Sequence, residues 1–184
     1  MTTKAQEKRK HILNSAINFL IENSFDDLTL DAIAKQANVS KGGLLYHFSS
    51  KEALCLGIVE QIFQDFINRF NELANKDPIE KGKWTRAYIN ASLFDINNAG
   101  IINIGLMSYS KLSNNSSIDE LLQFEYIQSK IAEDGIDPTI AMTIRLAIDG
   151  MYYSDMFNIM KLQTEVRNEI IKKLINATYE EERI

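Results

Sequence analysis

The stretch "NVSKGGLLYHFSSKEAL", residues 38–54, decides the fold of this chain. Two adjacent glycines, Gly42 and Gly43, stand at the start of a short apolar segment that otherwise has the composition of a helix. Each glycine inside a helix costs about 1 kcal/mol relative to alanine, so something near them should compensate. Ser40 can cap this helix, and Asn38 is a residue that tolerates the positive φ of a tight turn. The stretch therefore predicts a short helix that follows a tight turn.

The residues before this stretch predict two further helices. Apolar residues at helical spacing indicate a first helix from about Lys4 to Asn23. Thr29 is a suitable N-cap for a second, short helix with an apolar stripe within residues 30–37. Two short helices joined by a tight turn and braced by a longer helix form a helix-turn-helix unit, in which Val39 and Phe48 would fill the small core.

The rest of the chain also reads as helical. Ser49 and Glu52 are expected to form a capping box for a fourth helix from Lys51 to about Ala74, which would be roughly 36 Å long. Asp137 is expected to cap a later helix. Five helices are expected after Pro78, at about residues 79–96, 102–112, 117–133, 138–160 and 165–182. The sequence therefore predicts an all-α protein of about nine helices.

The charge of the chain is unevenly distributed. The net charge of the 184 residues is −5, which argues against binding to nucleic acid. However, seven of the 20 Lys/Arg and only six of the 25 Asp/Glu lie at or before Glu52, so this part of the chain carries a small positive charge. The basic residues gather in "KAQEKRK" and at Lys35, Lys41 and Lys51. Such an asymmetry suits a DNA-facing head on an acidic body, and a solvated surface is the alternative reading.

Residue types that carry enzymatic or metal chemistry are few and scattered. The chain has one cysteine, Cys55, which is expected to be an inert buried thiol, and two histidines, of which His11 is expected to be solvated. No grouping has zinc-ligand spacing, and there is no phosphate-cradling loop or nucleophile elbow. We therefore expect no metal, no cofactor and no enzymatic activity. The amino terminus lacks a signal-peptide core and no segment is expected to span a membrane, so we expect a cytoplasmic location.

The two glycines would have a function if the helix after Ser40 enters the major groove of DNA. A first turn without Cβ atoms can approach bases and phosphates closely. Lys41 adds positive charge there, and Tyr46 can donate its hydroxyl to a phosphate oxygen. The alternative is that "KGG" is a surface loop and that Tyr46 and His47 cover the core.

The run from Arg9 to Leu54 resembles the amino-terminal DNA-binding domain of the TetR family of transcriptional regulators. The matching elements are "LTLDAIAKQANVSKG", "YHF" and "SKEAL", in register over contiguous residues. The resemblance implies a three-helix DNA-binding domain over residues 1–50 and a helical effector-binding and dimerisation domain over residues 51–184. It implies a bacterial homodimer that binds double-stranded DNA at a palindromic operator. The expected DNA-binding residues are Thr29, Ser40, Lys41, Gly42, Gly43, Tyr46, His47 and Lys51.

The resemblance has two departures in the third helix. Family members commonly carry a polar residue where this chain has Gly43, and an aromatic residue where it has Leu45. Direct base readout should therefore be thinner, with more weight on backbone contacts and DNA shape.

The carboxy-terminal part contains long apolar segments. The segment 139–160 is apolar on nearly every face, so it needs its own core and a second subunit or ligand. Expected dimer-interface residues are Arg145, Asp149, Tyr153, Val166, Ile170 and Leu174, with Arg145 and Asp149 spaced to pair. Candidate effector-binding residues are Trp84, Phe94, Met107, Tyr126, Met142, Tyr152 and Met156, and the alternative is that these are simply core.

The sequence thus predicts a DNA-binding transcriptional regulator, a repressor that a small apolar or amphipathic effector releases from its operator. The hypothesis is that the effector prefers a conformer in which the fourth helix has tilted. The alternative is a helical ligand-binding or interaction protein with degenerate DNA binding, which would fit the departures at Gly43 and Leu45. The sequence determines neither the effector, the operator, nor whether the regulator represses or activates.

Overall fold

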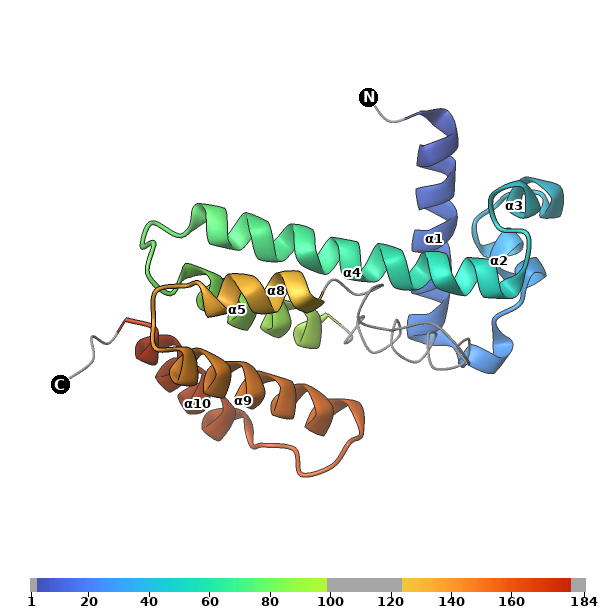
Figure 1. The fold of residues 1–184 in the computed structure, drawn as a ribbon. Helices are drawn as coiled ribbons and strands as arrows, with labels where there is room; N and C mark the ends of the chain where they lie inside the picture. The colour runs from blue at the N-terminus through green and yellow to red at the C-terminus, as the bar shows by residue number, and fades with distance from the viewer. Residues whose placement is uncertain (1–2, 99–123, 180–184) are drawn as a thin grey trace. The chain divides into compact units, whose positions relative to one another are not determined.

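The computed structural model describes residues 3–98 and 124–179, and within them every regular element is a helix (Figure 1). This confirms the all-α prediction. The elements are α1 (Lys4–Glu22), the short 3-10 helix η1 (Phe25–Asp27), α2 (Leu30–Gln36), α3 (Lys41–His47), α4 (Lys51–Lys76), α5 (Lys83–Asn97), α8 (Phe124–Ala132), α9 (Pro138–Met156) and α10 (Thr164–Ala177). The helix predicted at 102–112 lies outside the described residues.

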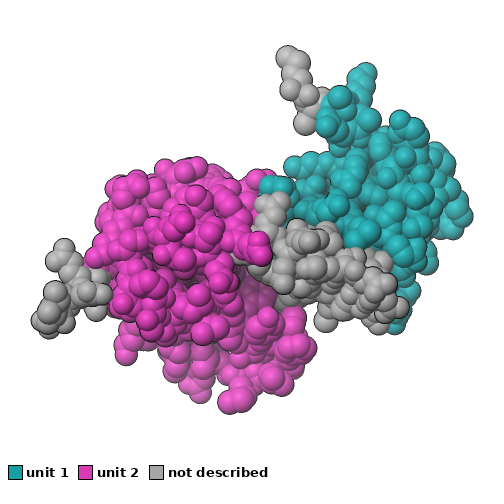
Figure 2. All heavy atoms as spheres, in the orientation of Figure 1, with its two compact units in different colours: residues 1–64, 101–117 teal, residues 65–100, 118–184 magenta. Residues whose placement is uncertain are grey.

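The described residues form two compact units, which are coloured separately in Figure 2. The first contains residues 3–64, and the second contains residues 65–98 and 124–179. The division falls within α4, between Gln64 and Asp65, so this helix contributes residues to both units.

The local signals at the start of the chain are confirmed. The Thr29 hydroxyl accepts the Ala32 amide at 3.1 Å, and the Ser40 hydroxyl accepts the Gly43 amide at 3.0 Å. These bonds satisfy amides that a helix leaves without partners at its amino end. Asn38 has a φ of 51°, which is the left-handed conformation expected of the turn between α2 and α3.

The cap of α4 was predicted one residue too early. The Ser50 hydroxyl accepts the Ala53 amide at 3.1 Å, and the Ser50 carbonyl accepts the Leu54 amide. Two adjacent serines both have the chemistry of a cap, and only the backbone at this corner decides between them. The N-cap is therefore Ser50, and the assignment of Ser49 was wrong.

The core of the first unit is shared by α1, α2, α3 and the first half of α4. Its fully buried side chains include Leu13 and Leu44, and Phe48 is also buried while Val39 packs against the cluster. Both plug residues are thus where the sequence placed them. Gly57 permits the packing of α4, because a Cβ built there would lie 2.8 Å from Cε1 of Phe48 and 3.1 Å from Cδ2 of Leu13.

Cys55 lies in the same core and is fully buried. Burial raises the pKa of its thiol to about 11. The thiolate is the reactive form of cysteine, so the expectation of a buried, unreactive thiol agrees with the structure.

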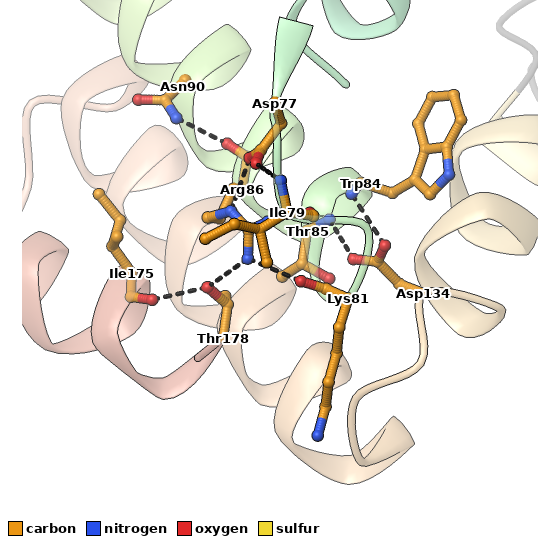
Figure 3. A network of polar contacts seen from close by, with 10 residues as sticks. All are labelled: Asp77, Ile79, Lys81, Trp84, Thr85, Arg86, Asn90, Asp134, Ile175 and Thr178. Atoms are coloured by element: carbon orange, nitrogen blue, oxygen red, sulfur yellow. Dashed lines mark hydrogen bonds and ion pairs between the residues drawn. The ribbon is translucent and has the colours of Figure 1, made fainter. Parts of the chain in front are cut away.

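The second unit begins its helix α5 later than the sequence predicted. We expected a start near Ile79, whereas the first helical residue is Lys83. Gly82 precedes it with a φ of 78° and provides no side-chain cap. The cap comes from Asp134, whose carboxylate accepts the amides of Trp84 at 2.9 Å and Thr85 at 2.6 Å (Figure 3).

A buried arginine closes the same end of the unit. Arg86 donates to the Asp77 carboxylate at 2.7 Å, to the carbonyls of Ile79 at 2.6 Å and Lys81 at 2.9 Å, and to the Thr178 hydroxyl at 3.1 Å (Figure 3). The hydrogen bond from Arg86 lowers the pKa of Asp77. A buried charge needs this degree of pairing, so the cluster ties the loop before α5 to the end of α10.

Helix α9 begins as predicted and ends early. Asp137 accepts the amides of Thr139 at 2.7 Å and Ile140 at 3.0 Å, and Pro138 occupies the first helical position. The helix was expected to reach Met160 but its last residue is Met156. Asn158 and Met160 adopt positive φ values of 55° and 47°, which no α-helix accommodates.

Within the described residues, none of the helices combines the length and the apolar character needed to cross a membrane.

Candidate nucleic-acid interface

Helix α3 shows its polar and aromatic side chains on the surface of the first unit. Tyr46 is 81% exposed and its ring makes an edge contact with half-buried His47, whereas Leu44 points into the core. The alternative prediction that Tyr46 covers the core is therefore wrong. Leu45 is also exposed, so α3 offers a tyrosine hydroxyl and an apolar side chain to anything that docks on it.

The hydroxyl groups predicted to bind DNA already hold the backbone in place. Thr29 and Ser40 both act as caps, and each uses its oxygen as an acceptor. A hydroxyl keeps one donor when it accepts a hydrogen bond. Both residues can therefore donate to a phosphate oxygen without giving up the cap.

Lys41 begins α3 and Lys51 begins α4, and both lysines contact neighbouring side chains. Lys41 forms an exposed ion pair with Asp31 at 3.0 Å. Half-buried Lys51 lies over the Phe25 ring, 4.9 Å from its centroid, and its ammonium is 3.5 Å from the Phe25 carbonyl. An incoming phosphate would compete with Asp31 for Lys41.

The two glycines differ in their surroundings. A Cβ added at Gly42 would meet nothing within 4 Å, so no crowding inside the chain requires glycine there. A Cβ at Gly43 would lie 3.1 Å from the Ser40 hydroxyl and 3.5 Å from the ammonium nitrogen of Lys8. The sequence signalled Lys8 only as one member of the basic run "KAQEKRK".

His11 is exposed on α1, as expected, but it also has a hydrogen-bonding role. Its Nε2 lies 2.9 Å from the carbonyl oxygen of Ala37, at the end of α2. Nothing in the local sequence pairs these two residues, so only the tertiary fold reveals the contact.

The candidate effector residues are distributed over the second unit. Trp84 packs on Phe70 with 5.1 Å between ring centroids, and Tyr126, which also contacts Phe70, donates to Asn71 at 2.7 Å. Phe94 is 44% exposed beneath the guanidinium of Arg69. Tyr152 donates to Asp95, while Met142 and Met156 are half-buried on α9. Met107 lies outside the described residues.

Arg145 and Asp149 form the pair that their spacing predicts, at 3.1 Å. Asp149 also accepts a hydrogen bond from Tyr88 on α5, and Arg145 donates to Gln128 on α8 at 3.1 Å. Burial and the charge of Asp149 raise the pKa of Tyr88. Tyr88 was missed in the sequence because its partner lies 61 residues away.

The other expected dimer residues lie on α9 and α10. Tyr153 and Val166 are exposed, at 54% and 47% respectively. Ile170 and Leu174 are half-buried and pack against the core formed by α5 and α9. The described residues contain no group of three or more metal-ligating side chains close enough to hold an ion.

Two protein-family models match the sequence, one over its amino-terminal part and one over its carboxy-terminal part. Residues 12–58 match "Bacterial regulatory proteins, tetR family", and residues 82–179 match "Tetracyclin repressor-like, C-terminal domain". The chain belongs to the TetR family. The resemblance drawn from the residues around α3 is thereby confirmed.

Curated transcriptional regulators match between about a third and two fifths of the chain. UidR, an HTH-type transcriptional regulator of Escherichia coli, is 42% identical over 72 residues, which are 39% of this chain and 37% of UidR. IcaR of Staphylococcus epidermidis, a negative transcriptional regulator of the biofilm operon icaADBC, is 39% identical over 57 residues, or 31% of each chain. The matches therefore span about a third of the length of these regulators.

Solved structures of TetR type match nearly the whole chain in fold. A transcriptional regulator of Streptomyces coelicolor A3(2) has a TM-score of 0.64 at 15% identity, over 95% of this chain and 99% of its own. The multidrug binding protein EbrR in complex with malachite green has a TM-score of 0.61 at 18% identity, over 91% of this chain and 98% of its own. These similarities establish the arrangement of a helix-turn-helix followed by a helical carboxy-terminal domain.

Proposed function

We propose that this TetR-family chain is a homodimeric repressor that binds a palindromic operator and leaves it when a small amphipathic effector binds. Residues 1–50 would form the DNA-binding domain, and residues 51–184 the effector-binding and dimerisation domain. The observation that carries the proposal is the exposure of Tyr46 on α3, beside cap residues whose hydroxyls can still donate. As a regulator of bacterial genes, the protein would act in the cytoplasm.

The proposed DNA contacts follow from α3 and the residues around it. Ser40, Thr29 and Tyr46 would donate to phosphate oxygens, and Lys41 would exchange Asp31 for a phosphate. Gly42, with open space around it, would allow the backbone to approach the duplex. His47, the last residue of α3, and Lys51, the first residue of α4, would contact the backbone of the same half-site.

Base recognition would be modest. Leu45, exposed beside Tyr46, offers a methyl-bearing side chain to a thymine methyl group, and Gly43 offers no side chain of its own. The remaining specificity would come from the shape and flexibility of the operator.

Dimerisation would use the exposed face of α9. The exposed residues, spaced alternately four and three apart, are Thr139, Thr143, Leu146, Gly150 and Tyr153 on α9 and Phe157 at its C-cap. This is the spacing of a helix–helix seam, and a two-fold axis near Gly150 would place the large residues Tyr153 and Phe157 opposite the smaller Leu146 and Thr143. Val166 would extend the seam.

The other expected dimer residues would make contacts within their own chain. Ile170 and Leu174 would hold α10 against the core formed by α5 and α9. Arg145 and Asp149 would stabilise the second unit through their hydrogen bonds with Gln128 and Tyr88.

The effector would bind in the second unit. EbrR has the same fold and binds malachite green and ethidium, and this unit carries aromatic and Met side chains together with hydroxyl and carboxylate groups. Such a mixture suits a ligand that is largely apolar with one or two polar groups.

Helix α4 would carry the signal. Its first half contributes Leu54 and Ile58 to the core of the first unit, and its second half contributes Ile67 and Phe70 to a core of the second. An effector that binds more tightly to a conformer with α4 displaced would favour that conformer, and one with equal affinity for both would change nothing. Two heads held about 34 to 36 Å apart fit successive turns of DNA, so a displacement of α4 would spoil the match.

The first experiment is recovery of genomic DNA fragments by the purified protein at about 150 mM salt, followed by sequencing. Enrichment of a shared inverted repeat is expected. Tyr46→Phe should weaken binding to that repeat while leaving the far-UV circular dichroism unchanged, and equal affinity of the two proteins would refute the role of Tyr46. Absence of enrichment would support the alternative, a helical ligand-binding protein with degenerate DNA binding.

A second experiment tests the effector site. Trp84 is the only tryptophan of the chain, so its fluorescence reports on the second unit alone. Malachite green should quench this fluorescence saturably and should lower the affinity for the operator. Saturable quenching with unchanged operator affinity would separate ligand binding from regulation and would refute the coupling through α4.

A further inference from the structure

We propose that Lys8, on α1, contacts DNA and supplies an ammonium group at the place on α3 where Gly43 has no side chain. This inference rests on the proposed function, because it adds a residue to the DNA interface. Neither the family resemblance nor the local sequence around α3 assigns a role to Lys8.

The geometry is internal to the first unit. A Cβ built on Gly43 would lie 3.5 Å from Nζ and 4.0 Å from Cε of Lys8. The end of the lysine side chain therefore borders the space that a side chain at position 43 would occupy. Helices α1 and α3 share one core through residues such as Leu13 and Leu44, which fixes this arrangement.

The position of Lys8 coincides with the line of proposed DNA contacts on α3. Ser40, Gly43 and Tyr46 follow one another at intervals of three residues, so they lie along one side of the helix. Ser40 carries a hydroxyl and Tyr46 an exposed phenol, and Gly43 lies between them with only hydrogen. Lys8 brings a functional group to the middle of this line from a different helix.

The charge of Lys8 is available. Its side chain is exposed, and it makes no ion pair or hydrogen bond with any residue of 3–98 or 124–179. By contrast, Arg9 pairs with Glu60 at 3.3 Å and Lys41 pairs with Asp31 at 3.0 Å. An anion that meets this surface would therefore reach Lys8 without displacing a carboxylate.

The chemistry of lysine selects the phosphate backbone over the bases. An ammonium is a compact, strongly hydrated point charge on a flexible stem, so it binds phosphate without the fixed geometry of a bidentate contact. Gly43 then has a second consequence: a bulkier residue would press on Ser40 and would displace the Lys8 ammonium. Where family members commonly carry a polar side chain on α3, this chain has Gly43, and the polar group at that place is the Lys8 ammonium from α1.

The test is a salt titration of full-length variants on two duplexes. One duplex carries the inverted repeat that the wild-type protein selects from a random pool, and the other is its scrambled counterpart. Lys8→Ala should lower the magnitude of the slope of log K against log salt by about 1 on both duplexes. Near 0.15 M salt this corresponds to a loss of about fivefold in affinity.

Three controls separate position from charge. Lys10→Ala makes the same change two residues along α1, and Lys161→Ala makes it in the second unit, so neither should alter the slope. Lys8→Arg keeps the charge and should retain the wild-type slope. Far-UV circular dichroism of all four variants should match the wild type, because each side chain is exposed.

Each outcome decides the proposal. An unchanged slope for Lys8→Ala, an equal reduction for Lys10→Ala, or a loss confined to the selected duplex would overturn the phosphate contact while leaving the proposed function intact. A wild-type protein that selects no inverted repeat from the pool and binds no random duplex would refute the proposed function itself, and the role of Lys8 with it.

Discussion

Replacement of Gly57 by alanine tests how tightly α4 is packed in the first unit. The new Cβ would lie 2.8 Å from Cε1 of Phe48, 3.1 Å from Cδ2 of Leu13 and 3.3 Å from a guanidinium nitrogen of Arg9. Arg9 can move, because its side chain is long and partly exposed. Phe48 and Leu13 are buried and have no such freedom.

The expected cost follows from these distances. To reach an ordinary contact of 3.4 Å, the Phe48 ring must retreat by roughly 0.6 Å inside a close-packed core. Overpacking of this kind costs about 2 kcal/mol, and the higher helix propensity of alanine returns about 1 kcal/mol. Gly57→Ala should therefore lower the free energy of unfolding by about 1 kcal/mol, which for a chain of this size is a fall in Tm of about 2 to 4 °C.

The assay is urea unfolding followed by far-UV circular dichroism, with Gly42→Ala as the matched control. Gly42 has nothing within 4 Å of its Cβ position, so the same substitution should leave stability unchanged or raise it. If Gly57→Ala proved as stable as Gly42→Ala, or more stable than the wild type, the reasoning from the Phe48 contact would be refuted.

Three further perturbations test other features. Asp134→Ala should lower the free energy of unfolding by about 2 kcal/mol, because it leaves two amides in the first turn of α5 without partners. A loss below about 0.5 kcal/mol in urea unfolding would show that this cap is dispensable. Asp77 has a pKa below its ordinary 3.8 because Arg86 donates to it, so its contribution to stability is present above that value and is lost as the pH falls through the lower, folded value. Asp77→Asn should flatten this acid dependence in melts between about pH 5 and pH 2, and an unchanged slope would contradict the assignment. Burial raises the pKa of Cys55 to about 11, so its thiol should react slowly with an aromatic disulfide at about pH 8. The rate in the native protein should be more than about 100-fold lower than the rate in urea. Comparable rates would mean that the thiol is accessible in the native protein.

The features that the sequence predicted well are those with local causes. The caps at Thr29, Ser40 and Asp137 and the turn at Asn38 each depend on a side chain and the backbone within a few residues of it. The same is true of the helix-turn-helix motif, whose residues are contiguous. Local chemistry fails where two neighbours are equivalent, as at Ser49 and Ser50, where the backbone at the corner between α3 and α4 decides which of them is the cap. It also fails at the end of α9, where positive φ values at Asn158 and Met160 end the helix before the predicted residue.

The features that the sequence could not predict depend on residues far apart in the chain. Helix α5 begins only at Lys83, where the carboxylate of Asp134 caps its first turn, and Asp134 lies about 50 residues away in the sequence. The bond between Tyr88 and Asp149 and the approach of Lys8 to Gly43 are of the same kind. Composition revealed that Lys8 belongs to a basic run, but only the packing of α1 against the core of the first unit shows which lysine reaches α3.

The surroundings of Gly82 constrain how this end of the second unit could evolve. A Cβ at Gly82 would lie 2.7 Å from a guanidinium nitrogen of Arg86 and 2.7 Å from the Thr178 carbonyl oxygen, in a backbone with a φ of 78°. Gly82 and Arg86 therefore form an epistatic pair, in which the effect of a substitution at one position depends on the residue at the other, whereas the Thr178 carbonyl belongs to the backbone and no substitution removes it. Shortening Arg86 first would relieve one of the two contacts, whereas a change at Gly82 would meet both at once. The order in which substitutions arise at these positions would decide which of them a descendant chain could accept.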